Sequence, residues 1–155
     1  MAIYLGIDAG TQGIKAELIE TANASPAGTF AVNFGTELPQ YSSPNGYIPN
    51  PDPLLKQADP LMWLDALELL FFKMRDAGVR MEKIAGISGS AQQHGSVYLN
   101  EKFNDILANL EKGQALAEQL RPALSRLLSP IWMDRPSILV LLCLQQLAIR
   151  LLWRQ

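Results

Sequence analysis

Two segments of alternating pattern, joined by a short glycine-containing turn, constrain the fold more than any other feature of this sequence. Residues 3–8 place large apolar side chains at every second position, as in a largely buried strand. Residues 14–18 alternate apolar with charged side chains, as in a strand with one face in water. Gly10 and Gly13 lie between them and suit a tight turn. The sequence therefore predicts an antiparallel β-hairpin.

Further strands are expected on both sides of a long loop. Residues 30–35, with apolar side chains at alternate positions, are predicted to complete a three-stranded antiparallel meander. Proline recurs between residues 38 and 60 and removes backbone donors, so we expect an irregular surface loop there. Residues 83–88 are predicted to form a fourth strand, and residues 97–99 another.

Helices are predicted to flank this sheet. Asp59 suits an N-cap and Pro60 a first helical position, and apolar residues then recur at helical spacing until Gly78, where the helix should end. Residues 103–128 are expected to be rich in helix, with Pro122 as a break. The predicted fold class is therefore α/β, with a mixed sheet that opens with the meander.

Composition excludes several classes of protein. The 155 residues suffice for one domain with a core, and 48% hydrophobic content argues against disorder. Thirteen basic against fifteen acidic residues give a net charge of -2, which argues against nucleic acid as a partner. A single cysteine and a single histidine exclude an internal disulfide and a metal centre built from these residues. The cysteine content suits a cytoplasmic location.

Neither end of the sequence indicates a membrane or secretory segment. The first residues lack the basic region of a signal peptide, and a carboxylate soon interrupts their apolar run, so secretion is not expected. Residues 138–153 are strongly apolar but include Gln145, Gln146 and Arg150, and they fall short of the roughly 20 apolar residues of a spanning helix. We therefore expect no membrane anchor.

The predicted turn carries residues suited to bind a nucleotide's phosphates. Glycines let backbone N–H groups approach a phosphate, a hydroxyl donates to it, and a lysine supplies charge. A carboxylate at the strand end could hold Mg²⁺ through water. The candidate phosphate-binding residues are Asp8, Gly10, Thr11, Gln12 and Lys15, with Asp8 also the candidate metal residue. An ordinary hairpin with a solvated lysine would show the same pattern, and no P-loop motif is present.

A second polar segment follows the fourth predicted strand. Gln92, Gln93 and His94 gather two amides and an imidazole in a short stretch before Gly95. Such groups recognise hydroxyls, because a ligand without them would leave buried polar groups unpaired. The segment therefore predicts a sugar or polyol site, although a lone histidine is more often a structural residue.

Together these motifs resemble the FGGY carbohydrate kinases, most of all the xylulokinases of the animal-type subgroup. The segment from Asp8 to Lys15 is similar to the first phosphate motif of the family, and residues 61–74 to the helix that follows it. Residues 89–98 are similar to the sugar-binding segment, and residues 129–134 to the Trp-x-Asp strand. The resemblance extends over roughly residues 3–134.

This resemblance implies a fold and an activity. It implies the front portion of an actin-like, ribonuclease-H-like ATPase fold, in which ATP with Mg²⁺ and a ketopentose meet in a cleft. The expected reaction converts D-xylulose to D-xylulose 5-phosphate. The residues expected to contact the sugar are Gln92, Gln93, His94 and Asp134. The general base and the adenosine site of the family would lie beyond residue 155, so the isolated chain is expected to be inactive.

The resemblance ends near Asp134 and divides the chain. Residues 1–134 are expected to be a partial N-terminal kinase domain, and residues 135–155 a divergent apolar segment. Our hypothesis for the latter is a frameshifted or prematurely ended reading, and the alternative is an amphipathic helix whose leucines pack on the core.

Two other functions stay open on the sequence. One is a non-catalytic binding or assembly module whose exposed apolar face recruits a partner, a homo-oligomer included. The other is a different actin-like ATPase, such as a chaperone domain.

Overall fold

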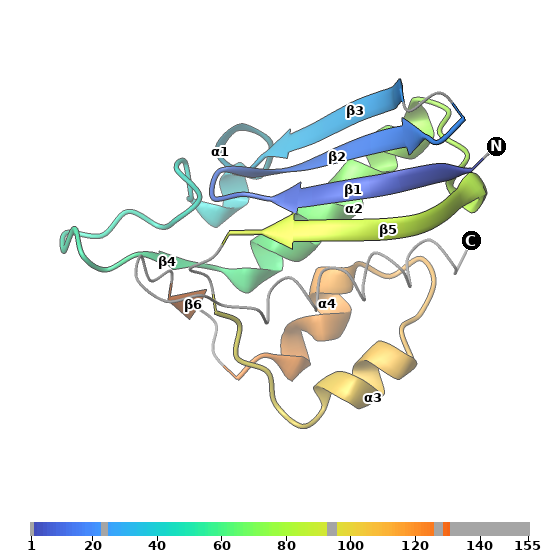
Figure 1. The fold of residues 1–155 in the computed structure, drawn as a ribbon. Coiled ribbons are helices and arrows are strands. Elements are labelled where there is room, and N and C mark those ends of the chain that lie inside the picture. Colours follow the sequence, from blue (N-terminus) through green and yellow to red (C-terminus); the bar gives the residue numbers. More distant parts are fainter. Residues whose placement is uncertain (1, 23–24, 93–95, 126–128, 131–155) are drawn as a thin grey trace.

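A four-stranded mixed sheet with a long helix across one face organises the chain (Figure 1). The computed structural model describes residues 2–22, 25–92, 96–125 and 129–130. The strand order is β3-β2-β1-β5, in which β2 is antiparallel to both its neighbours and β5 is parallel to β1. The strands of this sheet are β1 (Ile3–Ala9), β2 (Gly13–Glu20), β3 (Ser25–Asn33) and β5 (Ile84–Ala91).

The remaining elements are short apart from one helix. The helices are α1 (Phe34–Glu37), α2 (Pro60–Asp76), α3 (Phe103–Ala108) and α4 (Leu116–Leu120). The single-turn 3₁₀ helices are η1 (Pro39–Tyr41), η2 (Met81–Lys83) and η3 (Arg121–Ala123), and β4 (Gln57–Ala58) pairs with β6 (Ser129–Pro130). Among the described residues, no helix has the length and apolar character to cross a membrane.

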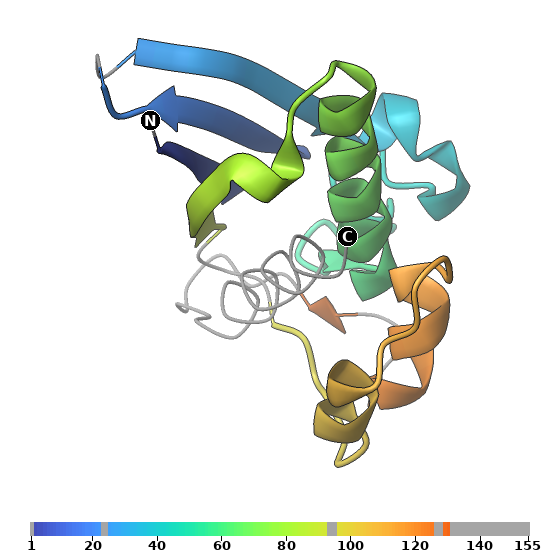
Figure 2. The same cartoon turned by 90° about the vertical axis from the view of Figure 1, so that its right-hand side faces the viewer.

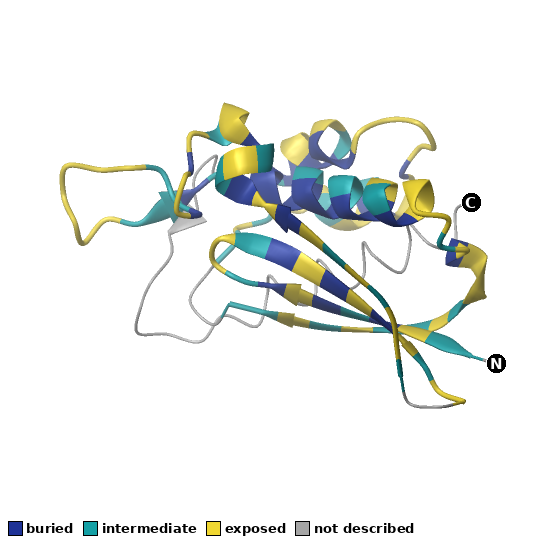
Figure 3. Ribbon diagram, turned by 90° about the horizontal axis from the view of Figure 1, so that it is seen from above, coloured by how far each residue is buried: buried dark blue, intermediate teal, exposed yellow. Residues whose placement is uncertain are grey.

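The core lies between the sheet and α2. Along β1 and β2 every second side chain is buried, as the predicted alternation requires, and the strands in Figure 3 alternate between buried and exposed residues. From α2 the side chains of Leu67, Leu70 and Met74 are fully buried in the same cluster. Figure 2 shows α2 on one side of the sheet only. The opposite, outward face of the sheet therefore stays open among the described residues.

Helix α2 confirms the capping pattern read from the sequence. The Asp59 side chain accepts a hydrogen bond from the Leu61 N–H at 2.9 Å, and Pro60 occupies the first turn. Lys73 and Arg75 lie in the last turn, where cations are favoured. Gly78 follows with φ at 81°, a left-handed conformation that favours glycine.

The third strand both begins and ends earlier than the predicted residues 30–35. It spans Ser25–Asn33, and Phe34 already begins α1. The Asn33 side chain accepts from the Thr36 N–H at 3.0 Å, while the Glu37 carboxylate accepts from the Asn33 N–H at 2.7 Å. This reciprocal capping starts a helical turn although the apolar alternation continues, because Phe34 can be buried in either conformation.

Two other expectations are corrected. The proline-rich stretch contains η1 and the two-residue strand β4, which pairs with β6, so it is not wholly irregular. Residues 97–99 form no strand; Leu99 makes a single antiparallel bridge to Leu124. The fourth predicted strand is confirmed as β5 but continues to Ala91, because its ladder with β1 runs to that residue. Residues 103–123 are helical in short pieces, with Pro122 inside a 3₁₀ turn.

Candidate functional site

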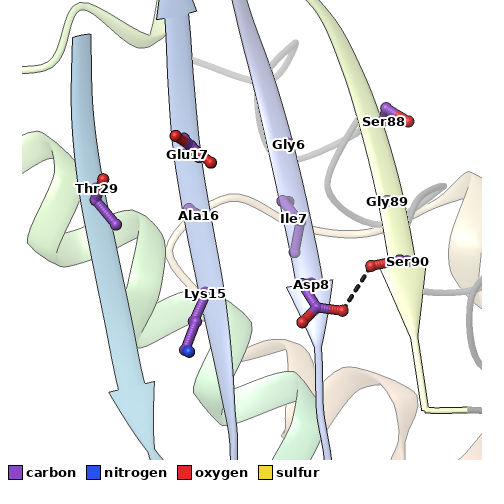
Figure 4. A pocket seen from close by; sticks show the side chains of 10 residues that line it. All are labelled: Gly6, Ile7, Asp8, Lys15, Ala16, Glu17, Thr29, Ser88, Gly89 and Ser90. Carbon is purple, nitrogen blue, oxygen red and sulfur yellow. Dashed lines mark hydrogen bonds between the residues drawn. The ribbon is translucent and has the colours of Figure 1, made fainter. Parts of the chain in front are cut away.

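The candidate site lies where β1 ends, on the outward face of the sheet. Asp8 is the second-last residue of β1, and its neighbours across the sheet are Lys15 on β2 and Ser90 on β5. All three side chains are exposed and lie on the face away from α2 (Figure 4). The Ser90 hydroxyl donates to Oδ1 of Asp8 at 2.5 Å.

Two open concavities meet at Asp8 and Lys15. The first, of about 360 Å³, lies at the hairpin end and is lined by Asp8, Gly10, Gln12, Gly13, Ile14, Lys15 and residues 31–33. The second, of about 430 Å³, continues along the outward face and is lined by residues 6–8, 15–17, 88–90 and Thr29. The structure thus gathers four of the five predicted phosphate-binding residues around one hollow. Thr11 is exposed at the turn but does not line it.

The chemistry around the first concavity favours an anion. In the described part of the chain, Lys15 has no ion-pair partner, since the ion pair found there joins Lys73 to Glu37. The N–H groups of Thr11 and Gln12 donate to no described residue. An unpaired ammonium group beside unused backbone donors is an arrangement that binds phosphate oxygens.

The turn is held from behind by contacts that the sequence did not reveal. The Phe34 N–H donates to the Gln12 carbonyl at 3.0 Å, which ties α1 to the turn. Gly46, with φ at 82°, packs so closely that an added Cβ would lie 1.7 Å from the Thr11 carbonyl oxygen. A Cβ on Gly13 would lie 2.4 Å from the Val32 carbonyl oxygen. Only glycine fits at these positions without movement of the backbone.

The predicted sugar-binding residues are described only in part. Gln92 is half-buried, and its N–H donates to the Ala9 carbonyl at 2.8 Å, which places it directly beside the end of β1. Its side chain lines neither of the two concavities. Gln93, His94 and Asp134 lie outside the described residues. Their roles stay predictions.

The residues present fit a nucleotide-bound magnesium ion rather than a metal cage. Within the described residues, no group of three or more histidine, cysteine, aspartate or glutamate side chains could hold a metal ion. Asp8 offers one exposed carboxylate. Magnesium is commonly bound through one or two carboxylates, its own waters and the phosphates of a substrate, so a single carboxylate beside a phosphate-sized hollow suits it.

A pair of half-buried polar side chains, Tyr41 on η1 and Asp65 on α2, lies outside the two concavities. The Tyr41 hydroxyl donates to Oδ2 of Asp65 at 2.6 Å. Burial, together with the hydrogen bond to and the charge of Asp65, raises the pKa of Tyr41 well above its usual range. The phenol therefore stays protonated as a donor, and the pair joins the 39–41 turn to α2.

Comparison with known proteins finds sequence similarity to proteins named xylulose kinases over most of this chain. No protein-family model matches the chain. The chain is 36% identical over 139 residues to xylulose kinase 2 of Arabidopsis thaliana, which covers 89% of this chain and 25% of that protein. It is 33% identical over 130 residues to the xylulose kinase of Mus musculus, with 84% and 23% covered. It spans about a quarter of the length of the curated relatives that it matches.

One solved structure agrees with the fold predicted from the sequence. The structure of a xyloylose kinase from Brucella ovis matches with a TM-score of 0.51 and 29% identity, covering 64% of this chain and 18% of that one. The predicted actin-like ATPase fold is therefore confirmed for the part of this chain that the matched structure covers.

Proposed function

We propose that this chain, a relative of the FGGY-type sugar kinases over about a quarter of their length, forms the phosphate-facing part of an ATP-dependent kinase that phosphorylates D-xylulose. One observation carries the proposal. Asp8, Gly10, Gln12 and Lys15 come from a strand end, a turn and a second strand, and they line one hollow. The relatives that bear sequence similarity are named xylulose kinases, which favours a sugar kinase over other actin-like ATPases.

Each of these residues would have a separate task toward ATP. Lys15 would pair with the terminal phosphates, because its ammonium group has no competing partner among the described residues. The free N–H groups of Thr11 and Gln12 would donate to phosphate oxygens. Asp8 would hold Mg²⁺ through water. The ion, when bound, offsets the negative charge of the phosphates during transfer.

The remaining parts of the proposal come from the predicted motifs. Gln92, Gln93, His94 and Asp134 would contact the ketopentose, and D-xylulose 5-phosphate would be the product. A boundary near Asp134 and a cytoplasmic location stay predictions, the latter resting on the single cysteine.

Ligand-dependent melting of the 155-residue chain tests the proposal. ATP with Mg²⁺ should raise the melting temperature, because at a ligand concentration of 100 Kd the folded state gains about 2.7 kcal/mol by mass action. Lys15→Ala should weaken ATP binding, so that the same rise in melting temperature needs about 10-fold more ATP. This loss corresponds to about 1.4 kcal/mol of binding free energy. Lys83→Ala is the matched control, because Lys83 is an exposed lysine at the opposite end of the β1–β5 pair. No shift with ATP, or equal losses in both variants, would contradict the proposal.

The sugar is tested in the same assay. D-xylulose should shift the melting temperature more than D-ribulose, D-fructose or glycerol, because correctly placed hydroxyls satisfy the amide and imidazole groups. Equal shifts for all four would contradict D-xylulose as the acceptor. We expect the chain alone to phosphorylate none of them at a sustained rate, since general acid–base catalysis contributes about 10²- to 10⁴-fold and the family resemblance includes no general base among the matched motifs.

A further inference from the structure

We propose that Ser90 is a positioning residue for Asp8, and that its hydroxyl fixes the carboxylate in the orientation needed to hold a nucleotide-bound cation. The inference rests on the proposed function for the role of Asp8 itself. It adds Ser90 on β5, which lies within the segment similar to the sugar-binding segment of the family but is not among the residues expected to bind phosphate or sugar.

The backbone fixes where Ser90 stands. In the parallel ladder of β1 and β5, Asp8 pairs with Ser90, so the two side chains emerge on the same face as direct neighbours. The ladder continues through Ala9 and Ala91, and the Gln92 N–H then donates to the Ala9 carbonyl at 2.8 Å. Ser90 is therefore held by main-chain bonds on both sides of its contact.

The contact itself is short and directional. The Ser90 Oγ lies 2.5 Å from Oδ1 of Asp8 and donates a hydrogen bond to it. A hydroxyl that donates to an ionised carboxylate forms a charge-assisted bond, which is shorter and stronger than a neutral one. In Figure 4 the second oxygen of Asp8 points away from Ser90. One carboxylate oxygen of Asp8 thus bonds to Ser90 on β5, and the other points into the hollow.

This arrangement is specific to one of three hydroxyls in the same concavity. Thr29, Ser88 and Ser90 all line it. Ser88 occupies the same face of the same strand two residues earlier, but its neighbour across the ladder is Gly6, which has no side chain. Thr29 lies on β3, where its neighbour is Glu17 on β2. Ser88 therefore provides a control that differs from Ser90 only in what stands opposite.

Loss of the bond should release the Asp8 side chain without unfolding the sheet. Asp8 is exposed, so without Ser90 its carboxylate would exchange between rotamers and bond to water instead. Partners that orient a metal-binding side chain typically change metal affinity by about 10- to 100-fold when removed. We expect the low end of this range, about 10-fold, because the site is open to solvent.

The first experiment measures the Asp8 side chain in the absence of any ligand. Three-bond scalar couplings of the isotope-labelled chain report the χ1 rotamer of Asp8. The parent chain, Ser88→Ala and Ser90→Thr should show one rotamer, and Ser90→Ala should show averaged couplings at an unchanged melting temperature. One retained rotamer in Ser90→Ala would overturn the proposal, and this readout does not depend on nucleotide binding.

The second experiment measures the affinity for ATP with Mg²⁺ by calorimetry. Ser90→Ala should weaken binding about 10-fold, and Ser90→Thr and Ser88→Ala should leave it within about 2-fold. In an Asp8→Ala background, Ser90→Ala should have no further effect, because the two residues act as a unit. If Ser90→Ala still weakened binding about 10-fold in the Asp8→Ala background, the positioning role would be overturned. Absence of nucleotide binding in the parent chain would instead contradict the proposed function, and the coupling experiment would still decide on Ser90.

Discussion

The two faces of the four-stranded sheet are built from the same strands but differ in character, since one is buried against α2 and the other is polar and open. On the face toward α2, residues such as Leu5, Ile14 and Leu18 are at most 3% exposed. On the outward face, Asp8 and Lys15 are exposed and surround open hollows. Since side chains of a strand alternate between faces, one short sequence can specify both a core and a polar site. Substitutions should therefore separate stability from binding by face.

The largest effect is expected in the core. Leu67→Ala on α2 removes a fully buried side chain and should lower the free energy of unfolding by about 3 kcal/mol, from lost burial and the cavity left behind. Phe72→Ala on the same helix removes a larger side chain that is 56% exposed and should change it by no more than about 0.5 kcal/mol. Urea unfolding followed by circular dichroism measures both. Similar losses would mean that α2 is not packed as described.

The next largest effect is expected where the site is braced from behind. Gly46→Ala should cost about 2 kcal/mol, because it combines a left-handed backbone with a clash against the Thr11 carbonyl. Gly78→Ala has nearly the same φ, 81° against 82°, but nothing within 4 Å of the added carbon, and should cost about 1 kcal/mol. Amide shifts of residues 10–13 should change in the first variant only. Equal costs and unchanged shifts would contradict the brace.

The smallest effect concerns a half-buried carboxylate between α2 and α4. Burial raises the pKa of Glu68, although the Leu116 N–H donates to its carboxylate at 3.1 Å. The folded state therefore binds this proton more tightly, and stability falls as pH rises from the ordinary carboxyl range through the raised pKa. Glu68→Gln keeps an acceptor for Leu116 and should flatten this fall. An unchanged slope of unfolding free energy against pH would contradict it.

The sequence predicted those features whose causes are local. The hairpin of β1 and β2 follows from side-chain alternation and glycine placement, and α2 follows from Asp59, Pro60 and Gly78. The end of β3 was missed because alternation continues through Phe34, while the capping by Asn33 depends on Glu37 folding back to it. Residues 97–99 were wrongly predicted as a strand because apolar residues there serve one bridge instead.

The candidate site was predicted in its composition but not in its support. The residues from Asp8 to Lys15 are contiguous, so their chemistry can be read along the chain. The bond from Ser90 depends on the register of a parallel pair 82 residues apart, and the contact of Gly46 with Thr11 depends on how a loop folds back. A serine on an alternating strand and a glycine after Asn45 gave no signal of either partner.

A map of amide shift changes on addition of ATP with Mg²⁺ tests the central claim most directly. If the hairpin end binds phosphates, the amide chemical shifts of residues 8–15 and 88–91 should change with the same saturable dependence on ATP concentration. The amide chemical shifts of α2 should not change. The changes should be lost in Lys15→Ala and retained in Lys83→Ala. Shifts confined to other regions, or no saturable change near Gly10 and Gly13, would contradict the assignment of this face to nucleotide binding.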